Sequence, residues 1–194
     1  MIIDVDIDGV LAKCVESINI FYNRLKGTTF RKEDYFTMLF EEVWKITKDE
    51  TRAIITRFFE EGHYPFISVE DGSQLVIQQL SRKHSMHVVS SRHNYSVQQT
   101  LRWLQKYFPD CFSGFHFTDY EKATTKQRIH RDLNCGLVLE DDLSATSQAA
   151  TLGIEVLLFD QPWNQKLYQS NGLVHRVKGW QEAEAYLKQR GLIC

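Results

Sequence analysis

Two aspartates stand one residue apart just after the short apolar run that begins the chain. The run covers residues 1–5 and is interrupted only by Asp4, and Asp6 and Asp8 follow it before Gly9. In a strand, residues two apart point to the same side, so both carboxylates are expected to reach one point beyond the strand end. Carboxylates that converge in this way repel each other unless a cation lies between them, and a hard, oxygen-seeking ion such as Mg2+ suits that place.

Two serines follow a later apolar stretch. Ser90 and Ser91 come after residues 86–89, which are expected to form a strand. A hydroxyl beside a free backbone N–H at a strand end can hold a phosphate oxygen. Serine pairs at strand ends are also common in simple turns, so these two residues alone leave both interpretations open.

Three consecutive acids follow another apolar stretch. Glu140, Asp141 and Asp142 come directly after residues 137–139. Carboxylates crowded at one place are costly without a counter-charge, and a cation shared with the first two aspartates would relieve them. We predict Asp141 as a metal ligand, with Glu140 or Asp142 as groups that orient it. An acid here can also cap the following helix, and the two roles are compatible.

The elements that must position these groups alternate between strand and helix. Apolar runs predict strands over residues 1–5, 86–89, 114–117, 136–139, 154–159 and 173–177. Helical spacing predicts helices over residues 10–26, 47–61, 72–82, 97–108, 126–133, 144–152 and 181–189. Such alternation is typical of an α/β fold, a Rossmann-like parallel sheet with helices on both faces. Every turn from a strand to a helix then lies at one edge of the sheet, where the separate polar groups are expected to meet.

The stretch between the first two strands has a different composition. Residues 28–66 are rich in aromatic side chains and show no strand-like alternation, and Thr47 to Glu50 reads as a capping box that opens a helix. We therefore expect a core domain made of residues 1–13 and 67–194, into which residues 14–66 are inserted as a small helical unit.

Composition limits the classes of function. The chain has 194 residues, 43% of them hydrophobic and 25% charged, with a net charge of −2. This is ordinary for a globular protein, and nothing predicts a nucleic-acid polymer or a membrane as partner. The four cysteines are scattered and the chain enters a strand without a basic leader, so a reducing, cytoplasmic location is expected. The oligomeric state is not readable from the sequence.

The first motif resembles that of the haloacid dehalogenase (HAD) superfamily of phosphotransferases. Residues 6–11, Asp-Ile-Asp-Gly-Val-Leu, match its pattern Asp-x-Asp-x-Thr/Val-Leu/Val after an apolar strand. Asp4-Val5-Asp6 is also Asp-x-Asp, but reading from Asp4 would place Asp8 where Thr or Val belongs. Asp6 is therefore taken as the first acid of the motif and Asp8 as the second.

The other motifs of the superfamily also find matches. Ser90, with Ser91 as the alternative, stands where the second motif carries Ser or Thr, and the acidic run resembles the fourth. The third motif is a lysine that neutralises phosphate and nucleophile, and Lys122 and Lys126 both qualify by location. Lys126 is preferred because it lies fourteen residues before Glu140, a spacing similar to that of bacterial nucleotidases in this superfamily.

Further segments resemble the 5'(3')-deoxyribonucleotidase-like branch of the superfamily. The segments are residues 88–92, 101–107, 158–165 and 177–180, and the helical insert has the place and size of that branch's cap. Arg92 ends the first of them, where it is expected either to approach the phosphate or ribose or to pair with a carboxylate. Asp4 within the strand and His93 in place of a common proline are departures from the pattern.

The resemblance implies a Mg2+-dependent phosphomonoesterase. It implies Asp6 as the nucleophile that forms an aspartyl-phosphate and Asp8 as the general acid and base. Ser90, Ser91, Arg92 and Lys126 would hold phosphate or substrate, and the metal would be held by Asp6, Asp141 and the backbone carbonyl of Asp8. Because the second acid is present, phosphoryl transfer is favoured over dehalogenation.

The expected substrate is a small phosphomonoester. A nucleoside or deoxynucleoside monophosphate is preferred, which makes the chain a 5'-nucleotidase or deoxyribonucleotidase, and Phe36, Phe40 and Trp44 are candidates to stack against the base. The alternative enzyme is a phosphatase for another metabolite, such as a sugar phosphate. A non-catalytic binding module on the same fold is the alternative of another class, and it would be favoured had an acid or the lysine been lost.

Overall fold

Strands and helices alternate along the chain. The computed structural model describes residues 1–92, 96–118, 125–166 and 172–194. Within these residues the strands are β1 (Ile2–Val5), β2 (Ser85–Ser90), β3 (Gly114–Phe117), β4 (Leu137–Glu140), β5 (Glu155–Phe159) and β6 (Val174–Val177). The α-helices are α1 (Cys14–Lys26), α2 (Phe40–Trp44), α3 (Lys48–Glu60), α4 (Ser73–Ser81), α5 (Val97–Tyr107), α6 (Lys126–Leu133), α7 (Leu143–Thr151) and α8 (Trp180–Gln189). The short 3₁₀ turns are η1 (Lys32–Asp34), η2 (Tyr64–Phe66) and η4 (Pro162–Asn164).

The strands of the described residues form one parallel sheet with β1 near its centre. The strand order is β3-β2-β1-β4-β5-β6. β1 pairs with β2 on one side, where Asp4 lies opposite His87, and with β4 on the other, where Asp4 lies opposite Val138. The predicted α/β fold is confirmed. A central first strand also delivers the residues after it to the middle of the carboxyl edge, where ligands bind in open α/β sheets.

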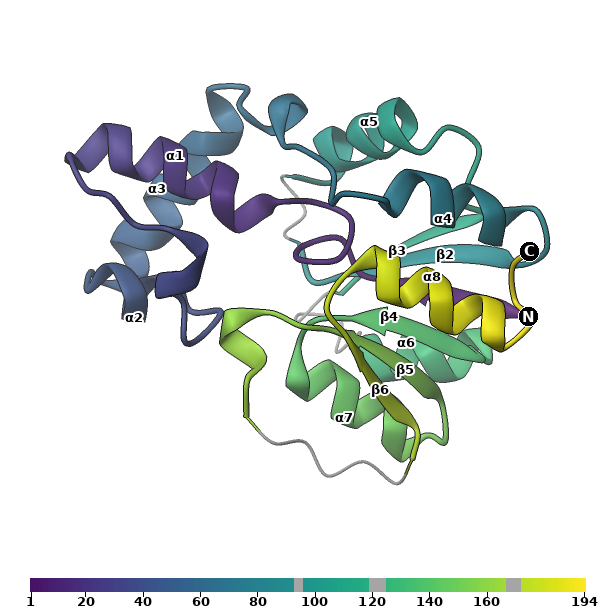
Figure 1. Ribbon diagram of the computed structural model, residues 1–194. Helices are drawn as coiled ribbons and strands as arrows, with labels where there is room; N and C mark the ends of the chain where they lie inside the picture. Colours follow the sequence, from purple (N-terminus) through teal and green to yellow (C-terminus); the bar gives the residue numbers. More distant parts are fainter. Residues whose placement is uncertain (93–95, 119–124, 167–171) are drawn as a thin grey trace.

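Helices cover both faces of the sheet. In Figure 1, α8 crosses in front of the strands, with α4 above it and α5 beyond, while α6 and α7 lie behind. Gln74 of α4 donates a hydrogen bond of 2.8 Å to the Tyr107 carbonyl of α5. Both faces of β1 and β4 are therefore buried, as the continuous apolar runs of a parallel sheet require.

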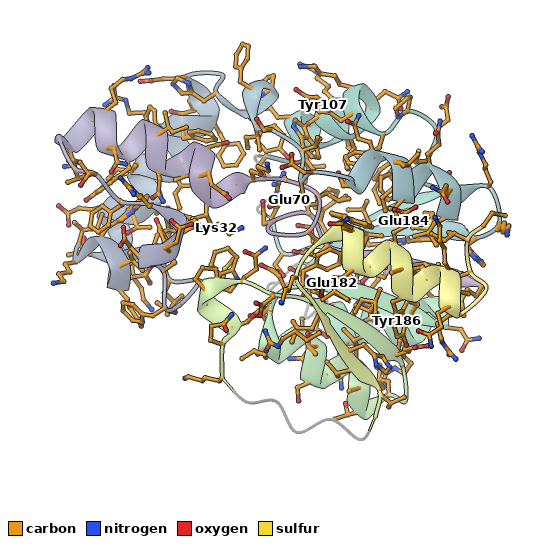
Figure 2. The ribbon with its side chains drawn as sticks, viewed as in Figure 1. Lys32, Glu70, Tyr107, Glu182, Glu184 and Tyr186 are labelled. Carbon is orange, nitrogen blue, oxygen red and sulfur yellow. The ribbon has the colours of Figure 1, made fainter. Side chains whose placement is uncertain are left out.

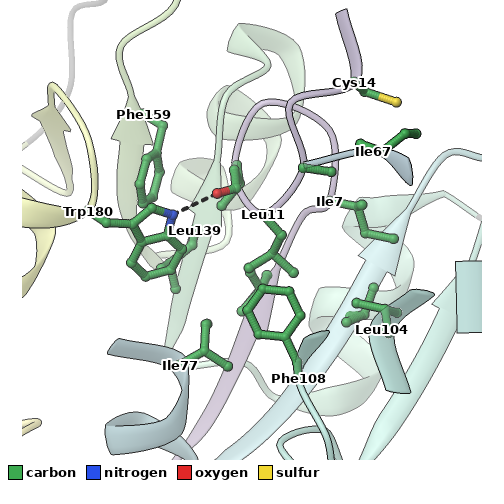
Figure 3. Close-up of a cluster of buried hydrophobic side chains, with 14 of the residues drawn as sticks. Ile7, Leu11, Cys14, Ile67, Ile77, Leu104, Phe108, Leu139, Phe159 and Trp180 are labelled. Carbon is green, nitrogen blue, oxygen red and sulfur yellow. Dashed lines mark hydrogen bonds between the residues drawn. The ribbon is translucent and has the colours of Figure 1, made fainter. Parts of the chain in front are cut away.

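The front face carries the main hydrophobic core. Leu11, Ile77, Leu139 and Phe159 pack there around Trp180, and each is at most 3% exposed (Figure 3). The indole N–H of Trp180 donates to the carbonyl of Val10 at 2.7 Å. Each buried side chain of this size contributes about 1.5–3 kcal/mol to folding, and the indole also fixes the loop that carries the first motif.

Residues 14–66 are helical, as the sequence predicts. α1, α2 and α3 lie to one side of the sheet in Figure 1. The Thr47 hydroxyl accepts a hydrogen bond from the Glu50 N–H, and the Glu50 carboxylate accepts one from the Thr47 N–H. The predicted capping box is therefore confirmed. The first helix is shorter than expected because residues 7–12 form a tight loop, in which the Ile7 carbonyl accepts from the N–H groups four and five residues later.

The chain enters and leaves this helical segment along two adjacent stretches. Ala12 forms an antiparallel bridge with Val69, and the Lys13 N–H donates to the Ser68 carbonyl at 2.9 Å. Beside them Lys32 of η1 lies 3.9 Å from the Glu70 carboxylate (Figure 2). None of the described helices is both long and apolar enough to cross a bilayer.

Candidate active site

Asp6 lies at the centre of the carboxyl edge and is paired with a lysine whose side chain is 11% exposed. The Lys126 ammonium, from the first residue of α6, donates to Asp6 Oδ1 at 2.8 Å and to Glu140 Oε1 at 2.7 Å. Burial alone would lower the pKa of Lys126, but the two carboxylates hold it well above its usual value. Burial raises the pKa of Asp6, although Lys126 opposes the shift. Lys122, the other lysine considered, lies outside the described residues.

Asp141 joins Asp6 from the end of β4. Its Oδ2 accepts a hydrogen bond from the Trp163 indole at 2.9 Å, and its carbonyl accepts from the Asn164 amide at 2.7 Å. Gly9 has a φ of +76°, and a Cβ at that position would collide with Asp141 Oδ2. The glycine of the first motif therefore has two physical reasons, the left-handed backbone and the close approach of this carboxylate.

Asp6, Glu140 and Asp141 form a group that can hold a metal ion. One carboxylate oxygen from each lies within 4.8 Å of the other two. Three carboxyl groups face one ammonium, so the negative groups exceed the positive by two. Burial raises the pKa of Glu140 and of Asp141 well above their usual values, and repulsion from Asp6 adds to both shifts. Glu140 Oε2 is buried and has no hydrogen-bond partner among the described residues. An all-oxygen site short of two positive charges fits Mg2+.

The Asp8 carboxylate lies apart from this group and is held by Arg92. Arg92 Nε donates to Asp8 Oδ2 at 2.9 Å, and Nη2 donates to Asp8 Oδ1. Desolvation by the surrounding protein would raise the pKa of Asp8, but the guanidinium outweighs it and holds that pKa below its usual value. Of the two expected positions for Arg92, against the phosphate or against a carboxylate, the structure shows the second.

The remaining predicted residues surround the same edge. Ser90 ends β2 and is buried, its carbonyl accepting from the Thr118 N–H at 3.0 Å, whereas Ser91 is exposed. Asp142 caps α7, because its carboxylate accepts a hydrogen bond of 2.7 Å from the Ala145 N–H. Among the described residues, those predicted to act in catalysis or to bind phosphate or metal all line one cavity.

This cavity has a volume of about 690 Å³ and lies between the sheet edge and the helical segment. Its floor contains Asp6, Asp8, Ser90, Ser91, Arg92, Lys126, Glu140, Asp141 and Asp142. The helical segment supplies an apolar wall of Val15, Ile18, Met38, Leu39, Phe40, Ile55 and Phe59. One end of the space is therefore charged and the other is apolar.

The three aromatic candidates have separate positions. Phe40 lines the cavity, whereas Phe36 is 65% exposed and is not among the lining residues. Trp44 is buried, and its ring stacks on that of Tyr22 at 3.9 Å between centroids. Trp44 is packed within the helical segment, because its neighbours on α1 cover its face.

The part of the site that follows β5 is not among the residues predicted from the sequence. Trp163 and Asn164 hold Asp141, and the Gln161 amide donates to the Gly9 carbonyl at 2.7 Å. The signal was available, because the turn after the fifth strand must reach the same sheet edge as the turns after the first and fourth.

Comparison with known proteins agrees with this geometry. The model of the family described as 5' nucleotidase, deoxy (pyrimidine), cytosolic type C protein (NT5C) matches residues 1–191. The 5'(3')-deoxyribonucleotidase of Bacillus subtilis strain 168 is 25% identical over 189 residues, which are 96% of this chain and 98% of that protein.

Solved structures with the same fold are HAD hydrolases. A haloacid dehalogenase-like hydrolase from Streptococcus pneumoniae superposes with a TM-score of 0.69 at 14% identity, covering 96% of this chain and 97% of the other. The HAD-hydrolase YfnB of Bacillus subtilis, whose structure is bound to magnesium, gives 0.65 at 11% identity, covering 96% and 98%. Since the family model spans nearly the whole chain, the protein belongs to the NT5C family of 5'-nucleotidases, which are phosphoric monoester hydrolases of the HAD superfamily.

Proposed function

We propose that the protein releases phosphate from nucleoside or deoxynucleoside 5'-monophosphates through an aspartyl-phosphate on Asp6. One observation carries the proposal. Asp6 lies between the Lys126 ammonium and the Asp141 carboxylate, at the charged end of a cavity whose opposite wall is apolar. A phosphate at the charged end would place the base of the nucleotide toward that wall.

The reaction proceeds in two displacements. In the first, an Asp6 oxygen attacks phosphorus, the bond from phosphorus to the ester oxygen breaks, and Asp8 gives its proton to that oxygen, which leaves as a hydroxyl. In the second, Asp8 takes a proton from water as the water oxygen attacks phosphorus and the bond to Asp6 breaks. Arg92 lowers the pKa of Asp8 and so favours the ionised form that the second step needs. Before the first step, a phosphate anion beside Asp8 would raise that pKa and favour the protonated form.

Phosphate oxygens are held by groups that already face the cavity. Lys126 supplies a positive charge, and Ser90 and Ser91 supply hydroxyl or backbone donors from the end of β2. Mg2+ bound by the Asp6 and Asp141 carboxylates and the Asp8 backbone carbonyl would neutralise the charge on phosphate and nucleophile. Glu140 keeps Lys126 in place through the 2.7 Å hydrogen bond.

The apolar wall supports a nucleotide over a sugar phosphate. The hydroxyl groups of a sugar need hydrogen-bond partners when they leave water, whereas the face of a base does not. Phe40 and Phe59 offer aromatic surface on this wall, and the other residues there are aliphatic or Met. A sugar phosphate would leave that part of the cavity poorly matched.

We also infer that residues 14–66 act as a cap on a core made of residues 1–13 and 67–194. The bridge between Ala12 and Val69 supports this division, because it brings both crossings of the chain to one narrow connection. The wall of the cavity thus belongs to one unit and its charged floor to the other. The choice of leaving group would then depend on the cap, and the chemistry would depend on the core.

Phosphate release from a panel of deoxynucleoside, ribonucleoside and sugar monophosphates with Mg2+ tests the proposal. We expect nucleotides to give the highest kcat/KM, and we expect Asp6→Asn to lose at least about 1,000-fold in kcat because the nucleophile is gone. Asp132→Asn on exposed α6 surface is the matched control and should retain activity. A preference for sugar phosphates would contradict the proposed substrate class. Equal activity of wild type and Asp6→Asn would contradict the proposed mechanism.

A further inference from the structure

The Arg92 guanidinium contacts four separate parts of the structure. Besides Asp8, it donates from Nη1 to Thr100 Oγ1 of α5 at 3.1 Å and from Nη2 to Cys14 Sγ of α1 at 3.6 Å. Its carbon lies 4.8 Å from the centre of the Tyr64 ring in η2, a cation–π contact. The fork is therefore fixed in place by both the core and the helical segment.

These contacts leave little of Arg92 for substrate. Of the five N–H donors of a guanidinium, four are used within the described residues, two of them by Asp8. The residue lines the cavity floor but is only 8% exposed, and its guanidinium packs against the Tyr64 ring. A clamp for phosphate needs parallel N–H groups that are free to face the anion, and here the parallel pair is occupied by a carboxylate.

We infer that Arg92 is a positioning residue for Asp8 and that Thr100 positions Arg92 in turn; this inference rests on the proposed function. Thr100 is fully buried and donates its own hydroxyl proton to the Ser96 carbonyl at 2.9 Å, so its oxygen is aimed at Nη1. The bidentate pair sets the plane of the Asp8 carboxylate, and through it the direction in which Asp8 exchanges a proton with the leaving oxygen.

The inference predicts an effect that depends on the leaving group. The alkoxide of a nucleoside is a poor leaving group and needs a well-aimed proton, whereas p-nitrophenolate leaves without one. Misplacing Asp8 should therefore lower kcat/KM for the nucleotide and spare kcat/KM for p-nitrophenyl phosphate. This constant leaves out the second displacement, in which Asp8 activates water whichever ester was cleaved. A phosphate ligand would behave differently, because its loss would weaken the binding of both substrates and of inorganic phosphate.

The experiment compares Arg92→Lys and Thr100→Val with wild type on a deoxynucleoside monophosphate and on p-nitrophenyl phosphate, with Mg2+ present. For Arg92→Lys we expect about a 100-fold lower kcat/KM on the nucleotide and less than about a 5-fold change in kcat/KM on the aryl ester. Thr100→Val, which keeps the side-chain shape, should show the same selectivity with about a 10-fold loss. The inhibition constant of inorganic phosphate should stay the same in both variants.

Two controls make the result decisive. Arg128→Lys, on the exposed face of α6, should leave the activity on both substrates unchanged. Asp8→Asn should show the selectivity of Arg92→Lys, and the double variant should lose no more than Asp8→Asn alone, because both changes act through one group.

Each other result overturns the inference. Equal losses on the two esters, or weaker inhibition by inorganic phosphate, would make Arg92 a phosphate ligand or a structural residue and leave the proposed function intact. If Arg92→Lys does not fold, Thr100→Val decides alone, and its failure to discriminate between the esters rejects the inference. A wild type that releases phosphate from neither ester rejects the proposed function together with the inference.

Discussion

Asp4 of β1 and Asp6, the residue that follows β1, reach the same helix, yet only Asp6 takes part in the site. Asp4 Oδ2 accepts from His130 Nε2 at 2.6 Å, and Asp6 Oδ1 accepts from Lys126 at 2.8 Å. Two residues of a strand span about 6.6 Å and four residues of a helix about 6 Å, so the two pairs form adjacent rungs between β1 and α6. We call the Asp4–His130 pair the sealed rung and the Asp6–Lys126 pair the open rung. The two share one geometry and differ in their surroundings.

The difference lies in charge balance and access to the cavity. The side chains of Asp4 and His130 are 3% and 0% exposed, and neither lines the cavity. Asp6 lines it, and two further carboxyl groups crowd the same point. A sealed pair of one acid and one base fixes the register of a helix on a strand. A pair with additional carboxyl groups around it carries uncompensated negative charge that a cation can neutralise. Because it also lies beside a cavity, substrate can reach it, and these two properties make it a site.

The largest expected effect is the loss of stability when the sealed rung, the Asp4–His130 pair, is broken. His130→Leu leaves the Asp4 carboxylate buried without its partner, so the free energy of unfolding should fall by about 3–5 kcal/mol. Asp4→Val/His130→Leu replaces both groups by apolar ones and should recover most of that loss. Denaturant unfolding measures both variants. At temperatures where they are folded, kcat should stay within about 3-fold of wild type, since neither residue touches the cavity.

A double variant less stable than His130→Leu would contradict this account, because it would mean that the Asp4 carboxylate does not need its partner. A collapse of kcat in the folded double variant would contradict the separation of the two rungs. In that case the sealed pair would hold Lys126 in place through α6.

The second prediction concerns the loss of the open rung, the Asp6–Lys126 pair. Lys126→Met removes the ammonium between Asp6 and Glu140 but keeps an unbranched side chain of similar length. We expect kcat to fall about 100- to 1,000-fold, as when a fixed electrostatic group is removed from a transition state. Steady-state phosphate release in excess Mg2+ measures the loss. Lys188→Met, on exposed α8, is the control, and a fall of less than about 3-fold in Lys126→Met would exclude a direct role in the transition state.

The two rungs also show what could be read from the sequence. Side chains two apart on a strand share a side, and strand ends share an edge, so the meeting of Asp6 with Asp141 follows from pattern alone. The same reasoning places Asp4 on the side of α6, where the spacing of Lys126 and His130 provides both partners. This second rung could have been predicted, but Asp4 stands out in the sequence only as an acid within an apolar run.

Other parts of the site depend on packing that no local pattern encodes. Arg92 faces Asp8 because Thr100 and Tyr64, from two different elements, fix its fork, and neither neighbour is evident from spacing. Trp44 and Phe40 stand four residues apart on one short helix, yet one packs on Tyr22 and the other lines the cavity. Aromatic residues at helical spacing do not reveal which of them faces a partner helix and which faces an open space.

The smallest expected effect sharpens the comparison by loosening one hydrogen bond at the open rung. Trp163→Phe keeps the ring but removes the N–H that Asp141 Oδ2 accepts at 2.9 Å. Groups that orient a metal ligand typically contribute about 10-fold or more to metal affinity, so the Mg2+ concentration for half-maximal activity should rise about 10-fold while kcat at saturating Mg2+ stays unchanged. The rise in melting temperature on adding Mg2+ should shrink in parallel, a readout independent of activity.

Trp103→Phe is the matched control, because its indole donates a single hydrogen bond of similar length, 2.8 Å, to the Ile67 carbonyl away from the acids. Both variants lose one buried hydrogen bond, at a similar cost of about 1 kcal/mol in stability. Only Trp163→Phe should change the response to Mg2+. If both variants raise the Mg2+ concentration for half-maximal activity equally, the indole at position 163 stabilises the fold without orienting Asp141. The carboxylates of the site would then bind the cation without its help.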